Sequence, residues 1–378
     1  MKQIIFFTIL SLFFSSCWNE KNATVINTGA QIVLNFEDQL STSLFSDKFF
    51  EHIGMIPLET TDKCLVGSRP EILADVNHFF IKELQQQVIL RFDKIGKFIN
   101  RIGQRGGGPG EYQGDIKDFE IDITSNIIEV LTQSGQLLRY SYEGNFISKQ
   151  NFGINVQSFI KSGPTYWLNL GVSKLFSDGR ILKVSENGTV IEKFLPLKTD
   201  WFGFEDLNFT RSDDIISFKE AFNHSVYRIT DSGPVETTVI NFGKYAIPKN
   251  VYDQNQISVF EELNKKGWAI IYRYLENKQF VYIFSIVQQN EEVIGFYHWL
   301  VNKKTGNSVL QKLLPDDFLF EMMEEAKILT SDNELVFIAN ASMLKKCTDP
   351  FFNSATNIRN SLTEESNPVI ISLKIKDF

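Results

Sequence analysis

The sequence of 378 residues has a net charge of −8, with 22% charged and 43% hydrophobic residues, which is ordinary for a globular protein. This acidic balance argues against nucleic acid or an anionic membrane surface as the main partner. Aromatic residues make up 13% of the chain, including 34 Phe, and this share favours strands over helices.

The first 17 residues have the pattern of an export signal. Lys2 gives a positive start, residues 4–14 form an apolar stretch too short to span a bilayer as a helix, and two serines precede Cys17. This pattern resembles a bacterial lipoprotein signal, in which cleavage leaves the cysteine as the lipidated first residue. The resemblance implies lipidation at Cys17 and anchoring to the outer membrane of the cell envelope, on its periplasmic face or at the cell surface. The alternative is an ordinary secretory signal with an incidental cysteine.

Residues 18–31 are polar and small, as expected of a flexible tether. We therefore assign the folded domain to residues 32–378 and leave the signal out of the fold prediction. The membrane is an expected partner through the anchor alone, and we expect the domain itself to be monomeric.

A repeat runs through this domain. Polar turns that end in glycine recur between short apolar segments, and glycine takes a positive φ in such hairpins without steric cost. The repeated positions are Gly96, Gly144, Gly188, Gly233 and Gly306. Another strand-like pair precedes each hairpin, so each unit has four short strands over roughly 45 residues, the size of one propeller blade.

Two segments depart from the repeat. Residues 248–278 exceed what a blade requires, and we interpret them as an insertion before the fifth blade. Residues 49–60 read as an isolated strand, which we expect to pair with the end of the chain and close the ring. The predicted fold is therefore an all-β, six-bladed β-propeller with four-stranded antiparallel blades, closed by an N-terminal strand. A seven-bladed ring or a β-sandwich with appendages is the alternative.

The stretch "GQRGGGPGEY" at 103–112 has five glycines in ten positions. A phosphate-binding loop would need Gly-Lys-Ser/Thr, or a glycine fingerprint, leading into a helix. Here Gly110 is followed by Glu111 and Tyr112 and then by a strand pattern, so we do not predict nucleotide binding. The glycines and Pro109 instead suit an irregular crossing from the rim of one blade to the axis at the next.

Residues 92–122, "FDKIGKFINRIGQRGGGPGEYQGDIKDFEID", resemble the first hairpin and inter-blade loop of the six-bladed β-propeller lipoproteins common in Bacteroidetes. They are similar, more distantly, to NHL-type repeats. "IPLET" at 56–60 and the lipoprotein signal fit the same family. The resemblance implies the propeller fold and the envelope location, but no particular activity.

Loops between blades usually open on the face of a propeller where ligands enter the channel. This placement makes one group of residues in the first such loop the candidate ligand site: Arg101, Arg105, Glu111, Tyr112 and Asp115. Arg105 could clamp an anionic or sugar oxygen while Glu111 accepts from a hydroxyl. In the alternative interpretation, Glu111 binds nearby backbone amides and Arg105 is solvated.

"TDWFGFED" at 199–206 falls between the third and fourth predicted blades. Trp201 and Phe202 lie close together there and could form an exposed platform for a sugar or a peptide. The alternative is a hydrophobic plug between blades.

Metal and cofactor sites are not predicted. Histidines occur at dissimilar points of their repeat units, and the sequence has no CxxC pair. The two remaining cysteines, Cys64 and Cys347, follow the closing strand and precede the chain end, so ring closure could bring them together as a disulfide.

The favoured function is a lipid-anchored propeller without catalytic activity that binds a glycan, peptide or partner protein at its channel face. The alternative is a lyase or hydrolase with its active site at the channel mouth. Three or more converging histidines or carboxylates at the mouth would favour the enzyme, and a flat aromatic or apolar mouth would favour binding.

Overall fold

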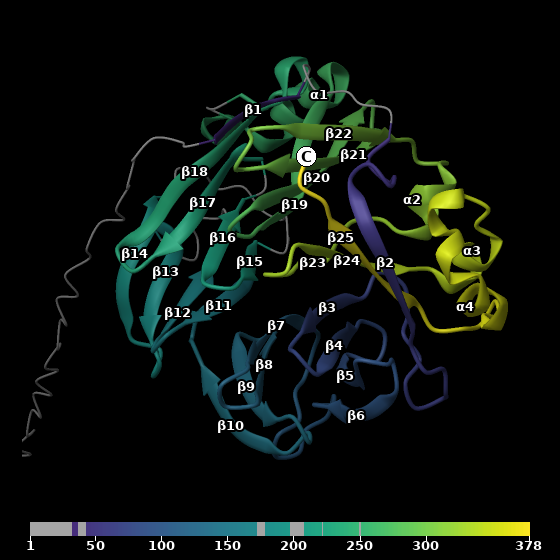
Figure 1. Ribbon diagram of the computed structural model, residues 1–378. Helices are drawn as coiled ribbons and strands as arrows, with labels where there is room; N and C mark the ends of the chain where they lie inside the picture. The colour runs from purple at the N-terminus through teal and green to yellow at the C-terminus, as the bar shows by residue number, and fades with distance from the viewer. Residues whose placement is uncertain (1–31, 37–42, 172–177, 197–207, 221, 249–250) are drawn as a thin grey trace, which may run out of the picture.

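The computed structural model describes residues 32–36, 43–171, 178–196, 208–220, 222–248 and 251–378. Six sheets follow one another around a ring in chain order, as Figure 1 shows. The predicted all-β, six-bladed propeller is thereby confirmed. The predicted signal and tether, with the lipidation site Cys17, lie outside the described residues.

Blades 1 to 3 are four-stranded and antiparallel, each built from consecutive strands. Blade 1 contains β3 (Glu71–Ala74), β4 (His78–Glu83), β5 (Val88–Asp93) and β6 (Phe98–Ile102). Blade 2 contains β7 (Ile116–Asp122), β8 (Ile127–Thr132), β9 (Gln136–Ser141) and β10 (Phe146–Asn151). Blade 3 contains β11 (Ser158–Ser162), β12 (Thr165–Asn169), β13 (Gly179–Ser185) and β14 (Val190–Pro196).

Blades 4 and 5 repeat the pattern with one addition. Blade 4 contains β15 (Phe209–Ser212), β16 (Ile215–Lys219), β17 (Ser225–Thr230) and β18 (Gly233–Asn241). A fifth strand, β1 (Ile32–Asn35), pairs in parallel with β18 and covers its outer edge. Blade 5 contains β19 (Trp268–Glu276), β20 (Phe280–Gln289), β21 (Glu292–Asn302) and β22 (Ser308–Leu313). The sequence did not predict β1.

Blade 6 joins the two ends of the domain. It contains β23 (Ile328–Leu329), β24 (Glu334–Ala339), β25 (Val369–Ile375) and, from the start of the chain, β2 (Phe50–Pro57). β2 and β25 are antiparallel, with pairs from Phe50↔Ile375 to Pro57↔Val369. The predicted closure of the ring by residues 49–60 is therefore confirmed.

Short helices connect some blades. The segment between blades 4 and 5 contains η2 (Gly243–Tyr245), η3 (Val251–Asp253) and α1 (Gln256–Lys266). Blade 6 is flanked by α2 (Phe318–Met322), α3 (Ala341–Lys346), η4 (Pro350–Ala355) and α4 (Thr356–Ser361). The insertion expected at 248–278 is shorter than predicted, because β19 of blade 5 begins at Trp268. The apolar face of α1 packs against this tryptophan through Val259 and Leu263.

The hydrophobic core is divided among the six interfaces between blades. Each interface holds buried side chains from two neighbouring sheets. Examples, taken around the ring from the interface of blades 1 and 2, are Phe80 and Tyr140, Leu137 and Tyr166, Trp167 and Phe218, Val226 and Trp299, Leu300 and Phe337, and Val336 and Leu90. Because middle strands are covered on both faces, their sequences are nearly continuous apolar runs. The first strands of the blades contact one another around the axis and line the channel.

The proposed disulfide between Cys64 and Cys347 does not form, since both residues are free thiols. They belong to different hydrophobic clusters, Cys64 between blades 6 and 1 and Cys347 between blades 5 and 6. The Cys64 thiol donates to the carbonyl oxygen of Glu59 at 3.1 Å. Ring closure places both cysteines beside blade 6, but on opposite faces of its sheet.

One turn glycine links blade 1 to the closing strand. Gly96 has φ +85°, and a Cβ atom there would lie 2.1 Å from the carbonyl oxygen of Pro57 at the end of β2. The carbonyl oxygen of Gly96 accepts from the backbone N–H of Glu59 at 2.8 Å. Gly153 has a similar φ, +70°, but no atom within 4 Å of such a Cβ.

We expect Gly96→Ala to destabilise the protein more than Gly153→Ala. Both substitutions force alanine into the left-handed region, at a cost of about 1–2 kcal/mol. Only Gly96→Ala also places a methyl group against Pro57, which adds about 1–3 kcal/mol. Denaturant unfolding of the two variants measures the difference, and equal losses would contradict the close contact between the turn and β2.

Candidate ligand site in the central channel

Two adjoining cavities lie along the axis. The mouth cavity has a volume of about 510 Å³ and opens among inter-blade segments that include Arg69, Asp115 and Gln157. The inner cavity, about 140 Å³, is lined by apolar residues such as Phe119 and Phe209 and by charged ones such as Arg211. The two cavities share four charged wall residues, which are Glu71, Lys82, Arg273 and Lys327. These shared residues mark the throat of the channel.

Four buried charges form an ion cluster in the throat. The Arg273 guanidinium donates to both carboxylate oxygens of Glu71 at 2.9 Å and to Glu325 at 3.2 Å. The Lys327 ammonium lies 2.6 Å from Glu325 and 3.3 Å from Glu71. Burial alone would raise the pKa of Glu71, but Arg273, Lys327 and Lys82 lower it to about 2. Two cations and two anions therefore balance one another within the cluster.

Lys82 adds a further cation beside this cluster. Its side chain comes from β4 and lines both cavities, although the residue is only 6% exposed. Its Nζ donates to the carbonyl oxygen of Lys117 at 3.0 Å. Within the described part of the chain, no carboxylate reaches ion-pair distance of this ammonium.

Asp118 is the carboxylate of β7 near the throat. Its two oxygens accept from the backbone N–H groups of Phe119 at 2.9 Å and Phe159 at 3.0 Å. Burial raises the pKa of Asp118 to about 6, against the lowering effect of Lys82 and these two amides. The residue thus ties the inner strand of blade 2 to that of blade 3.

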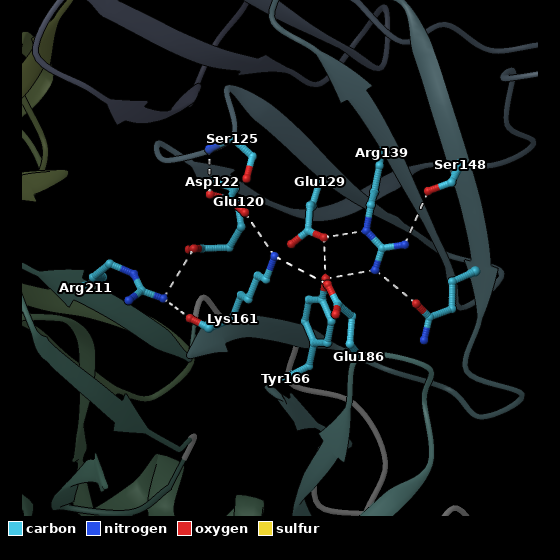
Figure 2. Close-up of polar contacts among 11 residues, drawn as sticks. Glu120, Asp122, Ser125, Glu129, Arg139, Ser148, Lys161, Tyr166, Glu186 and Arg211 are labelled. Carbon is cyan, nitrogen blue, oxygen red and sulfur yellow. Dashed lines mark hydrogen bonds and ion pairs between the residues drawn. The ribbon is translucent and has the colours of Figure 1, made fainter. Parts of the chain in front are cut away.

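Further along β7, Glu120 faces Arg211 of β15 at 3.7 Å (Figure 2). Arg211 also donates to the carbonyl oxygen of Lys161. Burial raises the pKa of Glu120 to about 8, more than Arg211 lowers it, and the nearby carboxylates of Asp118 and Glu129 raise it further. Glu120 therefore favours the protonated form more strongly than an exposed glutamate does.

A polar network between blades 2 and 3 continues from Glu120, as Figure 2 shows. The Arg139 guanidinium donates to Glu129 and to the Tyr166 hydroxyl, both at 2.8 Å, and the Tyr166 hydroxyl donates to Glu129. Lys161 binds Asp122 at 3.0 Å. These charges bind one another and hold the two blades together.

Four candidate residues of the first inter-blade loop find polar partners within the protein. Arg105 pairs with Asp115 and donates to the carbonyl oxygen of Gly114 at 3.1 Å. Glu111 accepts from the backbone N–H of Gly108 at 2.7 Å and from Gln104, and these bonds lower its pKa. The Tyr112 side chain is buried, and its hydroxyl donates to the carbonyl oxygen of Gln87.

The structure also separates these candidates in space. Asp115 lines the channel mouth, whereas Arg101 and Glu111 line a separate groove of about 390 Å³ at the rim of blades 1 and 2. The loop crosses from the outermost strand β6 to the innermost strand β7, so its two ends lie far from each other. Trp201 and Phe202 lie outside the described residues.

The throat residues were not predicted as a site. Their signal in the sequence is a charged residue beside apolar ones in a strand, as in "EILA" at 71–74 and "WAIIYRYLE" at 268–276, and "DFEID" at 118–122 shows the same alternation. Such a charge is costly to bury without a partner, so it indicates either a solvent-facing edge or a buried ion pair. Knowledge of which strand lies innermost would have distinguished the two.

Metal binding has no visible basis in the part of the chain that the structure describes, where no group of three or more His, Cys, Asp or Glu side chains could hold an ion. His298 is fully buried, and its Nδ1 shares a hydrogen bond of 2.9 Å with the Tyr282 hydroxyl. Burial lowers its pKa to about 3, so it stays neutral inside blade 5. It packs among aromatic rings away from the channel.

Residues 31–374 match a family described as a domain of unknown function, DUF4934. Among solved structures, the chain is similar to a Bacteroides fragilis protein predicted to be exported, with a TM-score of 0.76, 19% identity and coverage of 92% of this chain and 99% of that chain. It is also similar to a DUF4221 family member from Bacteroides vulgatus, with a TM-score of 0.56, 14% identity and coverage of 87% and 98%. No curated protein matches the sequence. At these identities the structural likeness establishes the shared fold.

We expect Glu120→Gln to flatten the pH dependence of stability between about pH 5 and 8. In this window the folded protein keeps a proton on Glu120 that the unfolded chain releases near pH 4.5, so the free energy of unfolding falls as pH rises. Glutamine carries no such proton and removes this contribution. Denaturant unfolding at four pH values measures the slope.

The matched control is Glu111→Gln, since Glu111 is partly exposed on its loop and its pKa is lowered, which places its contribution below about pH 4.5. It should leave the slope between pH 5 and 8 as in the wild type. Equal slopes for Glu120→Gln and the wild type would show that Glu120 is ionised in the fold.

Proposed function

The chain belongs to the DUF4934 family, whose function is unknown, and we propose that it is a lipid-anchored propeller of the cell envelope that binds a glycan, peptide or partner protein at its channel mouth. The observation that carries the binding role is the mouth cavity of about 510 Å³, which lies within the usual range of roughly 300–1,000 Å³ for small-molecule sites. Its walls are inner strands and short turns of a closed ring. A site on such walls is organised before the ligand arrives.

Export and anchoring rest on the N-terminal sequence. The apolar segment at 4–14 and the serines before Cys17 fit a lipoprotein signal, and the polar residues 18–31 would let the domain stand away from the membrane. None of the helices that the structure describes is long and apolar enough to cross a membrane. The similar fold of the Bacteroides fragilis protein predicted to be exported agrees with this proposal.

The occupied state of the channel carboxylates favours binding over catalysis. Glu71 is held by Arg273 and Lys327, and both oxygens of Asp118 accept backbone N–H groups. A general acid or base needs an oxygen within reach of the substrate. Glu120 is the exception, because its raised pKa would suit a general acid, and it is the observation in favour of the alternative, a lyase or hydrolase.

We expect Cys17→Ala to release the protein from the membrane fraction. Without the cysteine thiol there is no atom to carry the lipid, and no other anchor is proposed. Cell fractionation and labelling with a radioactive fatty acid measure the change. Cys64→Ala is the matched control, because this buried thiol lies in the folded domain and should leave both readouts intact. A membrane-bound, labelled Cys17→Ala protein would contradict the proposed anchor.

We expect Gln133→Trp to abolish ligand capture by the full chain. Gln133 lies exposed on the β8–β9 turn and lines the mouth, so an indole there would fill the cavity without disturbing the core. A glycan array and a pull-down from envelope extracts, each compared with the wild type, measure the loss.

Gln86→Trp is the matched control, since Gln86 is also exposed but lines the rim groove with Arg101 and Glu111. Loss of capture in this variant alone would move the site from the channel mouth to the rim. If the wild type turns over a captured glycan and Glu120→Gln does not, that result would support the alternative function, a lyase or hydrolase.

A further inference from the structure

We infer that the channel mouth binds an acidic sugar, with the carboxylate of a uronic acid received by Lys82. This inference rests on the proposed function and names the ligand class of that same site. It is drawn from the charge balance of the throat, from the polar groups around Lys82 and from the shape of the cavity.

The contacts in the throat leave Lys82 as the cation with no carboxylate at ion-pair distance. Glu71, Glu325, Arg273 and Lys327 neutralise one another through contacts of 2.6–3.3 Å. In the described part of the chain Lys82 donates its one hydrogen bond to the carbonyl oxygen of Lys117, and it acts on Glu71 and Asp118 only from beyond ion-pair distance, where it lowers the pKa of both. Glu71 and Asp118 offset part of the cost of burying this ammonium from a distance, and an anion in direct contact with it in the adjoining cavity would offset more.

The mouth as a whole favours a negative ligand. Its wall has five basic residues and three acidic ones, although the whole chain carries a net charge of −8. The basic residues are Arg69, Lys82, Lys117, Arg273 and Lys327, and the acidic residues are Glu71, Asp115 and Glu324. A cavity whose charge opposes that of the protein concentrates ions of the opposite sign.

The remaining polar groups suit hydroxyls. Gln133 and Gln157 line the same cavity as Lys82, and their amide groups both donate and accept hydrogen bonds, although Gln157 already accepts one from Lys117. Ser158 also lines the cavity, but its hydroxyl is bound to Asn208 and Asn169. Tyr272 adds a ring surface to the wall. One anionic contact surrounded by amide and hydroxyl groups matches a uronic acid better than a peptide, whose backbone would need an extended edge.

The test compares matched probes on the full chain. Isothermal titration calorimetry at low salt measures binding of D-glucuronate, of D-glucose, and of trialanine with a free or an amidated C-terminus. We expect glucuronate to bind roughly tenfold or more tightly than glucose, because hydrogen bonds to charged groups are the stronger ones. Lys82→Met should remove this preference, whereas Lys97→Met, which removes a cation from the exposed β5–β6 turn of the same blade, should not.

Each other outcome overturns the inference. If glucuronate and glucose bind equally and Gln133→Trp blocks both, the mouth is a ligand site but has no anion pocket. Binding of the free trialanine carboxylate alone would assign the pocket to a peptide. Absence of glucuronate binding would reject the acidic sugar, while the pull-down with Gln133→Trp still decides the proposed function. Should Lys82→Met not fold, the wild-type comparison of glucuronate with glucose decides.

Discussion

Ring closure is the constraint on which the rest of the structure depends. A sheet in this fold buries its faces only against the sheets beside it, so a row of six would leave two apolar faces in water. The chain avoids this by giving its last blade a strand from its own beginning, through seven residue pairs between β2 and β25. The interface of blades 6 and 1 is thereby buried like the others, with Leu90 and Val336 among its residues. The turn at Gly96 then packs against the end of β2 and joins blade 1 to the same closure.

Closure also creates the channel and its unusual electrostatics. The throat cluster draws Glu71 from blade 1, Arg273 from blade 5 and Lys327 from the entry to blade 6, so it spans the joint of the ring. Such buried pairs add little net stability compared with apolar packing, because desolvation offsets their attraction. Removal of one partner is costly, however, since it leaves a charge unpaired. The cluster therefore specifies how the first and last blades meet.

The sequence predicted the ring well because its signals are local. Turn glycines such as Gly144 and Gly188 recur with the blade, and each takes a positive φ in the structure. Other features depend on contacts between segments that lie far apart in the sequence. β1 is four residues long and becomes a strand only through parallel pairing with β18. The predicted insertion was too long because the strand pattern at 268–276 carries no sign that it is the innermost strand of blade 5.

The same contrast between local signals and long-range contacts applies to the candidate site. The inter-blade loop was predicted correctly as a crossing from rim to axis, but a crossing necessarily spreads its residues along its path. Only Asp115, at the inner end, lines the channel mouth, while Arg101 and Glu111 stay at the rim. The channel charges come from strands that look like ordinary core segments. Their function follows from which strand is innermost, and closure of the whole ring decides that.

The position of Lys82 is difficult to explain by stability. On this face of β4 Lys82 follows the buried Phe80, and methionine or leucine would fill a similar volume without the cost of desolvating an ammonium. Lys82 lowers the pKa of Glu71 and Asp118 but is bonded to neither, since Glu71 is held by Arg273 and Lys327 and Asp118 directs both oxygens to backbone N–H groups. A residue that costs folding free energy and faces a cavity fits a role in binding, where its charge is used by a molecule that enters from outside.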